Sequence, residues 1–193
     1  ADADSFIREG VDADPHADEF ELASDSEEEE DDEAEKSEKK EAIRKLREEN
    51  EQSTNLRFSR ACSACHAAEP LRRAVFIECG HAVCRECADA AASAACPNCE
   101  NRDRFVQLYE EEADDGPGFS RACVICVTDH PRARAYFTRC GHIICLACAY
   151  QLEADADADA YETDDDEDEI QVSCPMCKTE GTFEELKERL EAN

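Results

Sequence analysis

The stretch CGHAVCREC, residues 79–87, decides the fold, and the chain contains a second version of it, CGHIICLAC, at residues 140–148. Both follow the pattern Cys-x-His-x2-Cys-x2-Cys. A Cys-x2-Cys pair precedes each stretch and another follows it, so both copies present thiols and an imidazole in the same order. Thiolate sulfur and imidazole nitrogen are ligands that zinc prefers in proteins. Each copy therefore predicts a set of metal ligands.

The two stretches belong to a longer repeat. The sequence FSRAC occurs at residues 58–62 and again, identically, at residues 119–123. Residues 58–109 and 119–187 are two copies of one unit, joined by an acidic linker, EEEADDGPG, at residues 110–118. Because each copy carries its own complete ligand set, we expect two small domains in tandem.

Each unit supplies seven thiols and one imidazole, which is enough for two tetrahedral zinc ions with no open position. The spacing alone leaves open whether the eight ligands divide sequentially into two groups of four or interleave. All fourteen cysteines are used in this scheme, which disfavours disulfides. The predicted ligands of four zinc ions are Cys62, Cys65, Cys79, His81, Cys84, Cys87, Cys96, Cys99, Cys123, Cys126, Cys140, His142, Cys145, Cys148, Cys174 and Cys177.

Acidic residues dominate the composition: 50 Asp and Glu face 21 Lys and Arg, the formal net charge is −29, and there is no tryptophan. Such a chain cannot bury one large apolar core, so zinc has to stabilise its folded parts. The negative charge disfavours direct nucleic-acid binding, and no apolar run is long enough to span a membrane. Zinc-bound thiolates indicate a reducing, intracellular compartment, either nuclear or cytoplasmic.

The segment before the first unit divides into two parts. Residues 1–34 predict an acidic, disordered tail, because acidic runs such as SEEEEDDEAE at residues 26–35 repel themselves and lack apolar anchors. Residues 35–57 predict a charged helix, at residues 35–52, followed by a short linker. The apolar stripe of this helix consists of Ile43 and Leu46 alone, so we expect a solvated helix that leads into the first unit.

The second unit differs from the first by an acidic insert at residues 153–170, which we expect to be an exposed loop. Near the end of the chain, TFEELKERL at residues 182–190 has apolar residues spaced by three and four positions. Thr182 and Glu185 match the capping box that begins many helices. This pattern predicts a closing helix, whose end occupies residues 188–193.

Histidine is the fourth of the eight ligands in each unit, and each unit ends its ligand set with Cys-Pro-x-Cys. In these features the chain resembles the RING finger family, with two fingers in tandem at residues 58–109 and 119–187. A PHD finger, which places its histidine fifth, fits less well. The resemblance implies a small zinc-stabilised α+β fold made of two RING cross-brace domains in tandem, joined and flanked by acidic disordered segments.

A cross-brace interleaves the ligands. In the first unit, the resemblance implies one ion bound by Cys62, Cys65, Cys84 and Cys87 and another bound by Cys79, His81, Cys96 and Cys99. In the second unit, it implies one ion bound by Cys123, Cys126, Cys145 and Cys148 and another bound by Cys140, His142, Cys174 and Cys177.

RING fingers are associated with ubiquitin-protein ligases, which bind a ubiquitin-conjugating enzyme and leave the thioester chemistry to that enzyme. The resemblance implies docking residues in the second unit at Ile125, Leu152, Pro175 and Lys178. The first unit has Ala64, Ala91, Pro97 and Glu100 at these positions. Because the two alanines offer less apolar contact area, we expect the second finger to recruit the conjugating enzyme. The first would then be a support, dimerisation or substrate-binding module.

The expected partners are a ubiquitin-conjugating enzyme, ubiquitin and a protein substrate, and the acidic tracts favour a basic substrate. The alternative is a non-catalytic zinc-binding adaptor that binds basic chromatin proteins through the same tracts. Ile125, Pro175 and Lys178 favour the ligase. The alanines and Glu100 of the first unit, together with the acidic charge, favour the adaptor.

Overall fold

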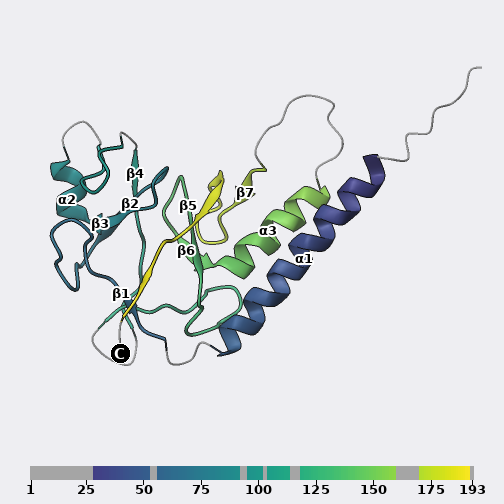
Figure 1. Cartoon of the computed structure of the whole chain (residues 1–193), viewed down its shortest axis with the longest axis horizontal. Coiled ribbons are helices and arrows are strands. Elements are labelled where there is room, and N and C mark those ends of the chain that lie inside the picture. The colour runs from purple at the N-terminus through teal and green to yellow at the C-terminus, as the bar shows by residue number, and fades with distance from the viewer. Residues whose placement is uncertain are drawn as a thin grey trace, which may run out of the picture.

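The computed structural model describes residues 28–52, 56–91, 95–101, 104–113, 118–159 and 170–191. Residues 1–27 of the expected acidic tail and residues 160–169 of the expected insert lie outside these ranges. Two units of similar architecture lie side by side, and a long N-terminal helix lies against the second of them (Figure 1).

The first unit is built on a three-stranded antiparallel sheet with the order β3-β2-β4. Every side chain of the central strand is buried, because β2 has a neighbour on each edge and the zinc-ligand loops around it. A short helix follows β3 directly. The elements are β2 (Arg73–Phe76), β3 (Ala82–Cys84), α2 (Arg85–Ala90) and β4 (Phe105–Gln107).

The second unit repeats this arrangement with the sheet order β6-β5-β9. Its central strand is again buried at all four positions. A two-stranded ribbon carries the last pair of cysteines. The elements are β5 (Arg134–Phe137), β6 (Ile143–Cys145), α3 (Leu146–Asp159), β7 (Val172–Ser173), β8 (Glu180–Gly181) and β9 (Phe183–Glu185). The repeat in the sequence is therefore a repeat in the fold.

The expected closing helix at residues 182–190 is wrong, because this segment forms two strands. Strand β9 pairs with β5, with Phe183 opposite Phe137, and β10 (Arg189–Leu190) pairs with β1 (Phe58–Ser59). The hydroxyl of Thr182 lies 3.0 Å from the hydroxyl of Thr138 instead of capping a helix. The edge of β5 supplies backbone partners to β9 that outweigh the local helical pattern, as the edge of β2 does for β4 in the first unit.

The insert is not a loop throughout. Helix α3 continues to Asp159, so the first residues of the insert are helical. Alanine, which has the highest helix propensity, alternates with aspartate there, and helix α1 (Glu28–Gln52) packs along α3.

Helix α1 begins earlier than expected and is not simply solvated. The Ile43 side chain is only 4% exposed, and Leu46 packs against the core of the second unit. At its end, the Asn50 side-chain oxygen accepts a hydrogen bond of 2.8 Å from the backbone N–H of Arg132. The helix therefore buttresses the second unit, although it is followed in the chain by the first.

The two units share a hydrophobic cluster that lies between them. Val75 and Leu108 come from the first unit, Tyr136 and Leu186 occupy the equivalent positions of the second, and all four are buried. The tyrosine hydroxyl donates a 3.4 Å hydrogen bond to the carbonyl oxygen of Ile77. The units are thus packed against each other rather than connected only by a linker.

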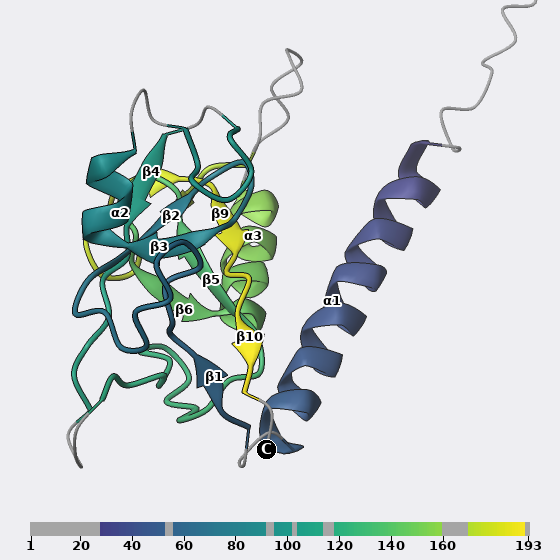
Figure 2. The same ribbon diagram turned by 60° about the vertical axis from the view of Figure 1, so that its left-hand side comes forward.

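The FSRAC repeats make reciprocal contacts across this interface. The guanidinium of Arg60 stacks 3.5 Å from the ring centre of Phe119, and that of Arg121 stacks 3.8 Å from the ring centre of Phe58. Strand β10 at the end of the second unit pairs with β1 of the first (Figure 2). Likewise, Glu112 after the first unit bridges to Phe119. Each unit therefore pairs its C-terminal segment with the N-terminal segment of the other.

Buried ion pairs lie at the interface, where Arg134 of the second unit is 3.6 Å from Glu110. Glu110, the first residue of the acidic linker expected to be disordered, has a side chain only 4% exposed, 2.6 Å from Arg73 and 2.9 Å from Arg60. The equivalent Glu188 lies 2.7 Å from Arg121 and also pairs with Arg134. Residues 114–117 of the linker lie outside the described ranges. The first residue of the linker is therefore part of the structural core.

Candidate metal centres

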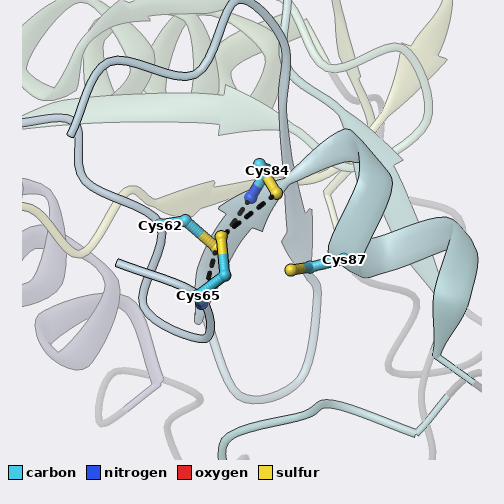
Figure 3. A group of neighbouring side chains, drawn as sticks. All are labelled: Cys62, Cys65, Cys84 and Cys87. Atoms are coloured by element: carbon cyan, nitrogen blue, oxygen red, sulfur yellow. Dashed lines mark hydrogen bonds between the residues drawn. The ribbon is translucent and has the colours of Figure 1, made fainter. Parts of the chain in front are cut away.

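The structure gathers the sixteen predicted ligands into four tetrads. In each tetrad the ligand atoms all lie within 4.8 Å of one another, and the tetrads are interleaved, as in a cross-brace. The sequential division is not found. Figure 3 shows one tetrad, with the sulfurs of Cys62, Cys65, Cys84 and Cys87 directed toward one another.

Each tetrad takes its ligands from separate segments of its unit. In the first tetrad of each unit, a tight turn supplies two cysteines, the end of a strand supplies the third, and the first turn of the following helix supplies the fourth. The strand residues are Cys84 of β3 and Cys145 of β6, and the helix residues are Cys87 of α2 and Cys148 of α3.

Every Cys-x2-Cys turn has the same backbone geometry. The residue after the second cysteine has a left-handed backbone, and its N–H donates to the carbonyl of the first cysteine over 2.8–3.0 Å. This geometry brings both sulfurs to one side of the turn, although a positive φ costs a non-glycine residue conformational energy. The four left-handed residues are His66, Glu100, Val127 and Lys178.

The distances between ligand atoms fit zinc. Four sulfurs about 2.3 Å from a tetrahedral zinc ion would lie about 3.8 Å apart. The Cys65 and Cys84 sulfurs are 3.8 Å apart, and those of Cys126 and Cys145 are 3.7 Å apart. In the first mixed tetrad, the Nδ1 atom of His81 lies 3.6 Å from the Cys96 sulfur. The four tetrads fit four zinc ions, with each histidine presenting Nδ1.

The thiols of the tetrads have strongly perturbed pKa values in opposite directions. Burial, together with the neighbouring thiols of Cys96 and Cys99, raises the pKa of Cys79 to about 12. At Cys62, burial also favours the neutral thiol, but hydrogen bonds from backbone N–H groups outweigh it and lower the pKa to about 6. A divalent ion stabilises all the thiolates of a tetrad at once. Zinc here is structural, since the protein fills every position of each site.

The expected docking residues lie on the second unit in different environments. Ile125 is 42% exposed, Lys178 is exposed, and Pro175 is half-buried. Leu152 is half-buried and packs against the hydrophobic core of its own unit.

Residues around Ile125 that the sequence analysis did not single out are also apolar. Val124, Val127 and Met176 are 45%, 74% and 44% exposed, respectively. The first unit has Ser63, His66 and Asn98 at the equivalent positions, and the Asn98 amide donates to the Ser63 hydroxyl. Comparing the two repeats position by position could have found this difference.

Helix α1 lies on the far side of α3 from Leu152. Leu46 of α1 shares a groove with Leu146 and Tyr150 of α3. Leu152 follows Tyr150 by two positions, about 200° around a helix. The packing of α1 therefore leaves the Leu152 side of α3 uncovered by this helix.

All fourteen cysteines lie in the described ranges, none forms a disulfide, and every one belongs to a tetrad. The fold thus leaves no thiol outside a metal site to act as a nucleophile. Within the described residues, neither α1 nor α3 has the apolar run that a bilayer-crossing helix needs.

Residues 122–179 match the family model of the zinc-RING finger domain. No curated protein and no solved structure matches the chain. The match covers the second unit, and the first unit repeats its ligand order, its interleaved tetrads and its sheet. The chain is therefore a tandem pair of RING-like zinc fingers.

Proposed function

We propose that this chain is a RING-type ubiquitin-protein ligase whose second finger docks a ubiquitin-conjugating enzyme. The observation that carries the proposal is the exposure of apolar side chains within the two cysteine turns of the second finger, where Val124, Ile125 and Met176 are each more than 40% exposed. Apolar side chains exposed together on a small domain are typical of a protein-binding surface.

The first finger lacks these features. Its side chains at the three equivalent positions are Ser63, Ala64 and Asn98, and an acidic Glu100 replaces Lys178. Because the first finger has the same fold but lacks these apolar side chains, we infer that the second finger alone recruits the enzyme. The first finger then serves as a support, through the interface described above.

The mechanism proposed is one of positioning. The conjugating enzyme carries ubiquitin as a thioester, and the finger holds enzyme and ubiquitin in a reactive orientation near the substrate. This raises the effective concentration of the ubiquitin thioester at the substrate. Zinc contributes by fixing the two cysteine turns that carry Ile125 and Lys178. Lys178 would donate hydrogen bonds to the ubiquitin-loaded enzyme, and its left-handed backbone fixes the direction in which it leaves the turn.

A self-ubiquitination assay with a panel of conjugating enzymes tests the proposal. Ile125→Ala removes about three carbons. Only the part of this side chain that is exposed in the free chain can become buried when the enzyme docks. We expect the affinity for the enzyme to fall by about 5- to 30-fold and activity to fall with it. Lys178→Ala should lower activity with less effect on affinity, since Lys178 acts on the loaded enzyme.

Two variants of the first finger serve as controls. Leu71→Ala removes an apolar side chain that is 70% exposed, and Glu100→Ala changes the counterpart of Lys178. Both should retain activity. Absence of activity with every enzyme, in protein that holds four zinc ions, would contradict the ligase and favour a non-catalytic adaptor for basic proteins.

A further inference from the structure

The metal loop of the second finger, residues 140–142, is covered by the first finger. The backbone N–H of Tyr109 donates a 3.0 Å hydrogen bond to the carbonyl oxygen of Gly141. The Tyr109 ring stacks on the imidazole of His142, with ring centres 4.9 Å apart and planes 22° apart. Thus one residue of the first finger contacts both the backbone of this loop and one of its zinc ligands.

The backbone of the first finger lies very close to this loop. A Cβ atom added to Gly141, which has φ +74°, would lie 1.8 Å from the carbonyl oxygen of Gln107. The strand end at residues 106–109 therefore approaches the loop as closely as a glycine allows. Rigid backbone, rather than a flexible side chain, forms this contact.

The reciprocal loop in the first finger is held differently. Lys187, the counterpart of Tyr109, lies over Gly80, where an added Cβ would be 3.0 Å from its Cδ atom. Its ammonium donates only a long bond of 3.4 Å to the carbonyl oxygen of Cys79. His81 has no stacked ring among the described contacts. The two metal loops are equivalent in sequence but unequal in support.

We propose that Tyr109 is a positioning residue through which the first finger holds the metal loop of the second in its zinc-binding conformation. Stacking restrains rotation of the His142 ring, and the backbone bond restrains the loop that carries Cys140. An ion leaves such a site only when a ligand moves away from it. The first finger therefore slows zinc release from the tetrad of Cys140, His142, Cys174 and Cys177. This inference does not depend on ligase activity.

The test compares Tyr109→Ala, Tyr109→Phe and Lys187→Ala in the full zinc-loaded chain. Tyr109 is 55% exposed, so its truncation should leave the fold intact. Two quantities are measured: the rate at which each of the four ions passes to an excess of a chromogenic chelator, and amide hydrogen exchange at residues 140–143 and 79–82.

In Tyr109→Ala, we expect one ion to be released about three- to ten-fold faster, as loss of a stacked ring pair predicts. Exchange should rise at residues 140–143 and stay unchanged at residues 79–82. Tyr109→Phe keeps the ring and should behave as the unchanged chain, and Lys187→Ala should leave residues 140–143 unaffected.

The proposal is overturned if Tyr109→Ala releases all four ions at unchanged rates. It is also overturned if exchange rises equally in both loops, because that result would indicate general loosening of the interface. The proposal is likewise overturned if amide hydrogen exchange at residues 140–143 rises as much in Lys187→Ala as in Tyr109→Ala.

Discussion

Glu110 shows how a single side chain joins the two fingers. Its carboxylate is buried between Arg60 and Arg73, and Arg134 of the other finger lies 3.6 Å away. Burial favours the neutral acid, but the charges and hydrogen bonds of Arg73 and Arg60 outweigh it and lower the pKa of Glu110 to about 2. The ionised form is therefore the one that stabilises the fold.

Glu110→Gln should lower the free energy of unfolding by about 3–5 kcal/mol at pH 7, because it removes the buried counter-charge that both Arg73 and Arg60 contact. Since the folded pKa is lowered, the stabilisation is complete above the unfolded pKa of about 4.3 and is lost as the pH falls toward 2. Urea titrations of the zinc-loaded chain between pH 7 and about pH 6 should thus show a constant difference in the free energy of unfolding between the two proteins, since Glu110 stays ionised there.

Glu69→Gln is the matched control. Glu69 also pairs with Arg60, but its side chain is 64% exposed, so its loss should cost less than about 1 kcal/mol. Equal effects of the two substitutions would show that Glu110 has no special role at the interface.

Helix α1 packs against the second finger, although few features of its sequence indicate this. The helix is strongly charged, and Ile43 is its one fully buried apolar side chain among the described residues. An ion pair of 4.0 Å between Lys39 and Glu153 and a 3.4 Å hydrogen bond from Arg47 to Gln151 complete the contact with α3.

Ile43→Ala should therefore detach much of α1 from α3. We expect a loss of about 2–4 kcal/mol in the free energy of docking and faster amide exchange in both helices, with the zinc content unchanged. Glu38→Ala, on an exposed position of the same helix, should have no such effect. If exchange in α3 is the same in both variants, α1 does not support the second finger.

The elements differ in how far the sequence predicts them. Metal ligation depends on residue type and short spacing, so the tetrads could be read from the cysteines and histidines. Strands β9 and β10 could not, because Phe183 and Leu190 also fit a helical period and the edges that pair with them lie far away in the chain. The repeat offered a clue to these strands. Phe105 and Leu108 of the first unit correspond to Phe183 and Leu186 of the second, and equivalent positions of a repeat are expected to adopt the same structure.

In the whole molecule, the two fingers are related by reciprocal contacts. Phe58 and Arg121 stack in one direction, and Phe119 and Arg60 stack in the other. The sequence showed that FSRAC repeats, but metal binding requires only its cysteine. The repeated phenylalanine and arginine contact each other across an interface that only the three-dimensional structure displays.

In this arrangement, the two fingers of one chain cover surfaces that a single finger would expose and could offer to a second copy. Val75, Leu108, Tyr136 and Leu186 are covered by one another, and the strand ends are paired. The core is small, so the interface and the metal sites together have to stabilise the fold. Zinc is the larger contribution, because each ion joins ligands from distant parts of a finger.

The most direct test of this account is the zinc content of the purified, reduced chain, measured by elemental analysis before and after treatment with a strong chelator. We expect four equivalents of zinc per chain, and removal of the metal should abolish the protection of the β2 and β5 amides together. Two equivalents or fewer in folded protein, or strands that stay protected without metal, would contradict it.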